Sequence, residues 1–201
     1  MSALPRAPPA PAPAAAPVPV PAPAGAPRTG ADGNPCRALR VIKVVVNAGV
    51  GESGEPRTKA EKVLVMITHQ KPVATRSHAT NRDWGIRAGQ EIGAKVTLRG
   101  ARAREFLDRA LDARDRRLDP DSIDRHGNIS FGIADYTDFL GLKYDPAIGI
   151  HGMDISIELG RAGWRIRRRA RAHRALRPSV RVTHEEAKKF LESELRVSFL
   201  E

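Results

Sequence analysis

The spacing of apolar and polar residues predicts six short strands between residues 40 and 200. The clearest is Asp154 to Leu159, where Ile155, Ile157 and Leu159 alternate strictly with polar residues, as in a half-buried strand. Short runs rich in β-branched residues, bounded by turn residues, predict the others. They cover residues 40–47, 73–75, 94–99 and 128–133, with residues 197–200 as a closing edge strand.

Three stretches have the apolar spacing of amphipathic helices. The first covers residues 58–68, and the second follows Gly100 over residues 101–118. The third begins at Thr183, because Thr183 and Glu186 have the spacing of a capping box. Strands joined by hairpin-like turns and mixed with helices predict an α+β fold. We expect an antiparallel or mixed β-sheet with helices packed on one face and the other face open.

The first part of the chain has a different composition from the rest. Residues 1–35 hold eleven of the sixteen prolines, interleaved with alanine. Proline lacks an amide donor and fixes its φ, so we expect a disordered Pro/Ala-rich tail that is not a signal peptide. Residues 36–201 are predicted to form a single domain. No stretch approaches the roughly 18 apolar residues of a membrane span, so no membrane partner is expected.

Residues 161–181, here called the arginine segment, carry most of the excess charge. They hold nine arginines and one histidine, with no Asp or Glu, and subtracting them from the net charge of +11 leaves +2. A block of one sign repels itself unless a polyanion neutralises it, and a guanidinium can bond two phosphate oxygens at once. Nucleic acid is therefore the first partner to expect, with a solvated basic tail or an anionic-membrane patch as alternatives.

Candidate catalytic chemistry is sparse. Cys36 is the only cysteine, and the six histidines do not fall at metal-ligand spacings, so we expect no metal, no cofactor and a reducing, cytoplasmic setting. Gly49, Gly51 and Gly54 form a GxGxxG motif after a strand, as in dinucleotide sites. No acidic residue follows near the end of the next strand, however, and Glu52 lies where a pyrophosphate would bind. The alternative is a tight turn with positive φ.

The connection over residues 75–87 combines arginines with an aromatic side chain. Arginines can contact phosphates while Trp84 stacks on a base, although Trp84 could instead pack into the core. Trp164 raises the same question, because it could anchor the arginine segment or stack on RNA. On these residues alone, a nucleic-acid chaperone or regulator and a nucleotide-dependent oxidoreductase are both possible functions.

A family resemblance covers residues 33–200. Six blocks in order, followed by an arginine-rich run before VTHEEAKKFL, resemble the universal large-subunit ribosomal protein five in its archaeal and eukaryotic form. The blocks are NPCRALRVIKVVVNAGVGESGE, HQKPVATR, DWGIRAGQEIGAKVTLRG, EFLDRAL, HGNISFGI and YDPAIGIHGMDI. The resemblance implies a non-enzymatic protein that binds 5S ribosomal RNA on its open sheet face. It also implies that the protein seats this RNA in the central protuberance, beside large-subunit rRNA and neighbouring 5S-associated ribosomal proteins.

The resemblance also assigns individual contacts. The family's RNA-contacting positions correspond here to Asn47, Gln70, Trp84 and Thr97. Further rRNA contacts, mainly to phosphates, are expected from Arg99, Arg165, Arg167, Arg168, Arg169, Arg171 and Arg174. We expect the arginine segment to be disordered or loosely held until RNA orders it.

A second contact is implied for the loop after the TR motif, which in the family reaches toward peptidyl-site transfer RNA. Its positions here are Arg76, Ser77, His78, Thr80, Asn81 and Arg82. His78 and Ala79 stand where paired lysines are usual, so the contact should be weaker or depend on Arg76 and Arg82. His69 replaces a usual glycine, which leaves the local turn geometry open.

Overall fold

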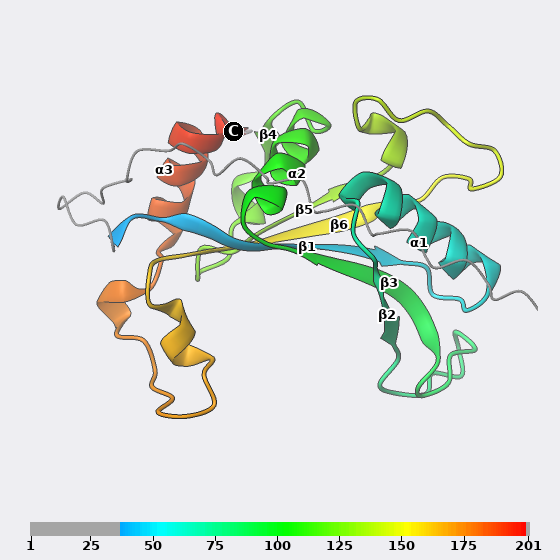
Figure 1. Ribbon diagram of the computed structural model, residues 1–201, viewed down its shortest axis with the longest axis horizontal. Helices are drawn as coiled ribbons and strands as arrows, with labels where there is room; N and C mark the ends of the chain where they lie inside the picture. The colour runs from blue at the N-terminus through cyan, green and yellow to red at the C-terminus, as the bar shows by residue number, and fades with distance from the viewer. Residues whose placement is uncertain (1–36, 200–201) are drawn as a thin grey trace, which may run out of the picture.

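A five-stranded antiparallel sheet is the centre of the computed structural model, which describes residues 37–199 (Figure 1). The strand order is β2-β3-β1-β6-β5, and each neighbouring pair is antiparallel. The strands are β1 (Arg40–Gly49), β2 (Val73–Arg76), β3 (Glu91–Leu98), β5 (Ile129–Ile133) and β6 (Met153–Gly160). The α+β prediction is confirmed. The tail expected over residues 1–35 lies outside the described residues.

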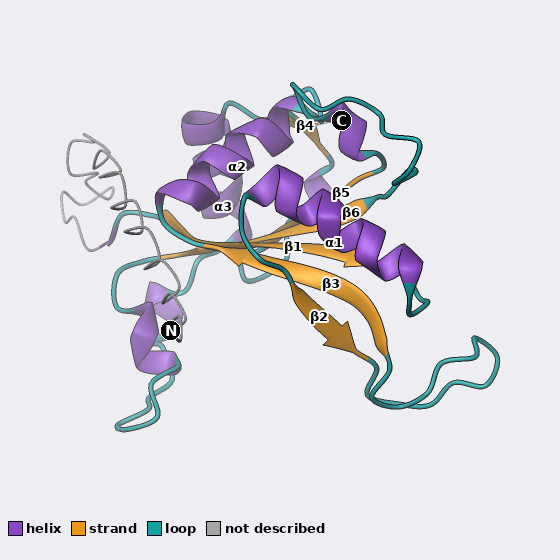
Figure 2. Cartoon of the chain, turned by 45° about the vertical axis from the view of Figure 1, so that its right-hand side comes forward, coloured by secondary structure: helices purple, strands orange, loops and turns teal. Residues whose placement is uncertain are grey.

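The α-helices within the described range lie on the same side of the sheet (Figure 2). They are α1 (Glu55–Thr68), α2 (Ala101–Asp112) and α3 (His184–Leu195). The layers meet in one hydrophobic cluster, which includes Val44 and Val46 of β1, Leu64 of α1 and Leu107 of α2. Burying each such side chain contributes roughly 1.5–3 kcal/mol. None of the helices described is both long and apolar enough to cross a bilayer.

The start of α1 and the end of α2 differ from the predicted boundaries. Helix α1 begins at Glu55 rather than at residue 58, because Pro56 fits the first turn, where its missing amide is not needed. Helix α2 ends at Asp112 rather than at residue 118. Asp115 and Arg116 have φ of 53° and 56°, in the left-handed region, so the helix cannot continue through them.

The predicted closing strand does not join the main sheet. Strand β7 (Ser198–Phe199) pairs in parallel with β4 (Arg117–Leu118) in a separate two-stranded sheet. The capping box of α3, in contrast, is confirmed. The Glu186 amide donates to Thr183 Oγ1 at 3.4 Å, and the Thr183 amide donates to Glu186 Oε2 at 3.2 Å.

The glycine motif after β1 forms a tight turn. Gly51 and Gly54 have φ of +82° and +109°, the conformations that glycine adopts at low cost. The chain then passes through α1 into β2, but β3 lies between β1 and β2. In a dinucleotide-binding unit the two strands that flank the helix are parallel neighbours. The topology therefore supports the turn interpretation.

Candidate nucleic-acid interface

The sheet face opposite the helices presents short polar side chains in cross-strand rows. In one row Asn47 of β1 lies between Lys95 of β3 and Asp154 of β6. In the next row Val45 lies between Thr97 and Ser156. Side chains that are directly opposite have Cβ atoms about 4.5–5.5 Å apart, so each row is a continuous surface. Asn47 and Thr97 thus share the face left uncovered by the helices.

Gln70 is brought to the same area by the turn after α1. His69 has φ of 51° and ψ of 30°, and its amide donates to the Val65 carbonyl at 2.9 Å, which closes the helix. This left-handed position suits glycine, and a histidine there costs about 1–2 kcal/mol. The turn directs Gln70 toward β3, where Nε2 donates to the Thr97 carbonyl at 3.4 Å. Arg99 is exposed immediately beyond the end of β3.

The arginine segment hangs from the end of β6, on the side of the sheet away from the helices (Figure 1). It contains two 3-10 turns, η4 (Trp164–Arg167) and η5 (Pro178–Val180). Its first part is attached by Arg161, which donates from Nη2 to Glu186 Oε1 at 2.6 Å and from Nε to the Arg37 carbonyl at 3.1 Å. Looseness of the segment without RNA stays a prediction.

Glu158 of β6 is the main attachment point of the arginine segment on the sheet. Its Oε1 accepts hydrogen bonds from Trp164 Nε1, at 2.9 Å, and from Arg168 Nη2. The ammonium of Lys43 lies 3.2 Å from Oε2, close enough to pair in charge although not aligned as a hydrogen bond. Burial by itself raises the pKa of Glu158, but Arg168 and Lys43 outweigh it and hold the pKa below its usual value. The carboxylate is therefore ionised at neutral pH.

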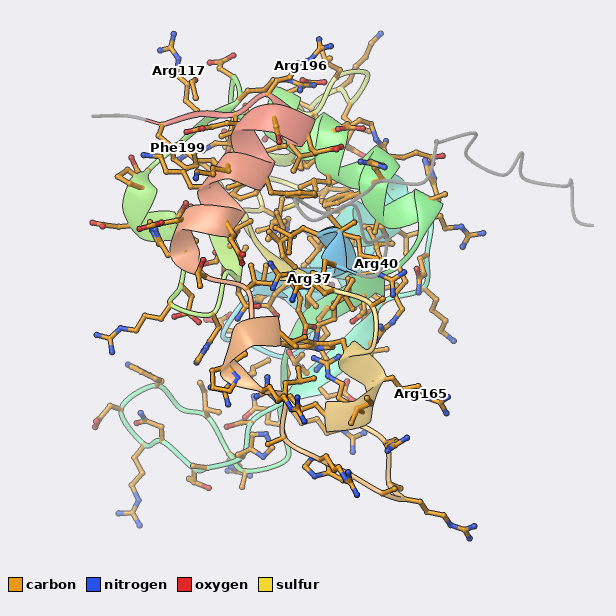
Figure 3. The ribbon with its side chains drawn as sticks, turned by 90° about the vertical axis from the view of Figure 1, so that its left-hand side faces the viewer. Arg37, Arg40, Arg117, Arg165, Arg196 and Phe199 are labelled. Carbon is orange, nitrogen blue, oxygen red and sulfur yellow. The ribbon has the colours of Figure 1, made fainter. Side chains whose placement is uncertain are left out.

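Because of this attachment, some arginines of the segment contact the protein itself and others are exposed to solvent. Trp164 anchors the segment, because its indole N–H bonds to Glu158 and the Arg167 guanidinium lies 5.4 Å above its ring. Arg168 is held by the same carboxylate, so it is less available to phosphates than the charge of the segment predicts. The other expected contacts, all exposed, are Arg165, Arg169, Arg171 and Arg174. Figure 3 shows Arg165 pointing away from the body of the protein.

The loop between β2 and β3, residues 77–90, is a well-bonded hairpin. Asn81 and Ile86 exchange backbone hydrogen bonds of 2.8 and 2.9 Å, and Ile86 is buried at the base of the turn. Thr80 Oγ1 accepts from the Ala88 amide at 3.1 Å, and Asn81 Oδ1 accepts from the Asp83 amide at 3.0 Å. Thr80 and Asn81 thus stabilise the loop, whatever else they contact.

The tip of this loop is open to solvent. Trp84 is 75% exposed, so the alternative in which it packs into the core is wrong. His78 and Arg82 are exposed as well, and Ser77 Oγ donates to the Ala79 carbonyl at 2.7 Å. Arg76, at the start of the loop, pairs with Glu91 at 3.3 Å. The loop extends from the opposite end of the sheet to the arginine segment (Figure 2). Trp84 lies within this loop, outside strands β1 and β3, which carry Asn47 and Thr97.

Several side chains of the open face were not named as site residues from the sequence. They are Lys43, Lys95, Asp154, Ser156 and Glu158. Strand periodicity identified the polar face of residues 154–159, but it does not say which strand lies beside which. The signal for Asp154, Ser156 and Glu158 was therefore present, and only their neighbours were unknown.

Comparisons with known proteins cover nearly all of the described residues. The family described as ribosomal protein L5 matches residues 34–87, and the ribosomal L5P family C-terminus matches residues 91–199. The large ribosomal subunit protein uL5 of Thermoplasma volcanium is 47% identical over 166 residues, which are 82% of this chain and 98% of the relative. Its counterpart in Sulfurisphaera tokodaii is 48% identical over 170 residues, 84% of this chain and 96% of the relative. That of Methanoculleus marisnigri is 50% identical over 159 residues, 79% and 95% respectively.

Proposed function

Because the chain belongs to the uL5 family of large-subunit ribosomal proteins, we propose that it binds 5S ribosomal RNA and helps attach it in the central protuberance. The chain is a structural component of the large ribosomal subunit and not an enzyme. Binding to 5S ribosomal RNA is the more specific part of the proposal. It rests on the resemblance in the motifs and on the arrangement of the open sheet face.

The observation that carries the proposal is the grouping of Asn47, Gln70 and Thr97 on one uncovered surface. Double-stranded RNA presents a wide, shallow minor groove of 2′-hydroxyls and base edges. A twisted sheet with short amide and hydroxyl side chains fits such a groove, and binding does not have to immobilise long, flexible side chains. Asn47 and Thr97 would form direct hydrogen bonds, and the bond from Gln70 to the Thr97 carbonyl would keep β3 and the α1 turn in register.

The arginine segment would supply affinity rather than sequence choice. Contacts to phosphates release counterions, so each neutralised phosphate adds to binding and to its salt dependence. The segment and the open face lie on the same side of the sheet, so one RNA could meet both (Figure 1). Arg99 lies on that side as well, and adjoining large-subunit rRNA would meet arginines that 5S RNA leaves free.

The β2–β3 loop supports a second, weaker contact with peptidyl-site transfer RNA. Arg82 and Trp84 lie at its exposed tip, where a guanidinium and a stacking ring could meet a backbone and a base. Because His78 and Ala79 replace paired lysines, Arg76 and Arg82 would provide most of the charge. Neighbouring 5S-associated ribosomal proteins would then meet surfaces that the RNA does not cover.

The direct test is to purify the chain from its own cells and to sequence the RNA that accompanies it. We expect mainly 5S ribosomal RNA, and the chain should sediment with the large subunit after a moderate salt wash. A broad mixture of messenger RNAs, with loss of the chain from the subunit in that wash, would instead favour a free RNA chaperone or regulator.

A matched pair of variants tests which surface selects the RNA. Asn47→Ala should weaken binding to a 5S transcript about fivefold, since one hydrogen bond is worth about 1 kcal/mol, and leave the salt slope unchanged. Arg171→Ala should weaken binding to any RNA and flatten the salt slope by about one ion. The two slopes are measured by titration at several salt concentrations, and equal slopes would contradict the division.

A further inference from the structure

The open face contains one carboxylate that no cation neutralises within the part of the chain that the structure describes. Asp154 of β6 is exposed there, and its carboxylate forms no hydrogen bond or ion pair with another residue of the described range 37–199. Glu158, four residues further along β6 on the same face, is buried and held by Lys43 and Arg168. Asp154 therefore differs from Glu158 in having no structural task that explains its charge.

The surroundings of Asp154 leave its carboxylate accessible. On β5 its partner is Gly132, and a Cβ built on that glycine would lie 3.6 Å from Asp154 Oδ1. The carboxylate thus lies next to a position that has no side chain to cover it. On β1 its partner is Asn47, followed by Lys95 on β3. The row presents a carboxylate, an amide and an ammonium at successive steps of about 5 Å.

A free carboxylate is costly on a surface that meets RNA. It repels phosphates, and it accepts hydrogen bonds but cannot donate them. That cost is offset only where the RNA places a donor against it. Two kinds of donor lie in the minor groove, the 2′-hydroxyl of every nucleotide and the amino group of guanine, and only the second depends on the base, since the adenine and uracil edges there offer acceptors. Asn47, one strand away, can donate to the ring-nitrogen acceptor on the same edge.

We propose that Asp154, together with Asn47, reads the amino group of a guanine in the minor groove of the bound RNA, which makes Asp154 a specificity-determining residue. The proposal rests on the proposed function, because it needs a structured RNA on the open face. The carboxylate affects the binding of both the correct RNA and competing RNAs. It stabilises the RNA that places the guanine amino group against it, and it disfavours RNAs that place a phosphate there.

The test compares the full chain with Asp154→Asn on a 5S transcript and on an unrelated duplex of equal length. The variant should bind the 5S transcript more weakly and the duplex slightly more tightly, so that their affinity ratio falls about tenfold. Asp138→Asn, an equal charge change on η3 (Tyr136–Asp138) at the helix side of the sheet, should leave the ratio unchanged. Thermal unfolding by circular dichroism verifies that both variants fold.

The RNA side supplies the decisive readout. Inosine lacks the amino group of guanine, so randomly inosine-substituted 5S transcripts are selected for binding and the positions of interference are mapped. The unchanged chain should show interference at a guanine that disappears with Asp154→Asn. Interference that persists in the variant, no interference at all, or an unchanged affinity ratio would overturn the inference. If the unchanged chain shows no preference for the 5S transcript, the proposed function fails instead.

Discussion

The arginine segment and the β2–β3 loop extend from opposite ends of the same sheet and are held in different ways (Figure 2). The loop is held by backbone pairing, with the Asn81–Ile86 bridge and two short side chains as acceptors. The arginine segment is held by side chains, chiefly the bonds of Trp164 and Arg168 to Glu158. The loop is thus stabilised by its own hairpin, whereas the segment depends on side-chain bonds to other elements, above all on the buried carboxylate of Glu158 and also on the bond from Arg161 to Glu186.

The difference has a physical reason. A hairpin with alternating backbone bonds satisfies its own polar groups and needs little from the rest of the protein. A run of like charges gains nothing from closing on itself, so its attachment must come from an anion elsewhere. Glu158 provides that anion on the sheet surface, and the pairing uses up Arg168 in return. Arg168 is therefore neutralised by Glu158, and this pairing fixes the position of the other arginines of the segment.

The largest effect is expected from removing this carboxylate. Glu158→Ala should lower the free energy of unfolding by about 3 kcal/mol, because it removes two hydrogen bonds to a charged group. Chemical denaturation measures the loss. Trypsin should cleave the arginine segment faster than in the unchanged chain, while cleavage after Arg82 in the loop serves as an internal reference. Glu192→Ala, on the exposed side of α3, is the control, and equal acceleration at both places would contradict the comparison.

Acid should release the segment but not the loop. Because the pKa of Glu158 lies below its usual 4.5, its stabilisation is complete above that value and is lost as the pH falls through the lowered pKa. In Trp84→Phe, the emission of Trp164 should shift to the red with a midpoint below 4.5 as its indole leaves the sheet. The same titration of Trp84→Phe with Glu158→Gln should lack this transition. A midpoint above the usual value would show that the cations do not dominate burial.

A smaller effect is expected on RNA binding, which should differ between the arginine segment and the β2–β3 loop. Arg165 in the segment and Arg82 in the loop are both exposed arginines, so their removal is a matched change of charge. Arg165→Ala should weaken binding to a 5S transcript and lower its salt slope by about one, whereas Arg82→Ala should change neither. Filter binding over a series of salt concentrations measures both. Equal losses would mean that the loop and the segment meet the same RNA.

The smallest effect concerns the side-chain acceptors of the loop. Asn81→Ala removes the bond from the Asp83 amide and should speed hydrogen exchange of the Ile86 amide about fivefold, which corresponds to about 1 kcal/mol. Exchange followed by NMR resolves this amide. His78→Ala, a change at an exposed position of the same loop, should leave the rate as it was. Unchanged exchange in Asn81→Ala would show that backbone pairing alone stabilises the hairpin.

Much of the fold followed from local patterns, and the errors fell where local patterns end. The strand at residues 154–159 and the Thr183 capping box were predicted correctly, because a period of two and a cap each depend on a few adjacent residues. The end of α2 was placed too late, since Leu118 continues the helical spacing although it belongs to β4. Charges and apolar spacing did not reveal the left-handed residues in between.

The sequence by itself determined the family, most of the strands and helices, the open polar face and the concentration of charge, because each depends on neighbouring residues or on motif order. Only the tertiary structure decided that Glu158 lies against Lys43 and Arg168, that Trp164 bonds to Glu158, and that Asp154 lies beside Asn47. These are contacts between elements distant along the chain. Strand order and register set them, and no periodicity within a single strand specifies its neighbours.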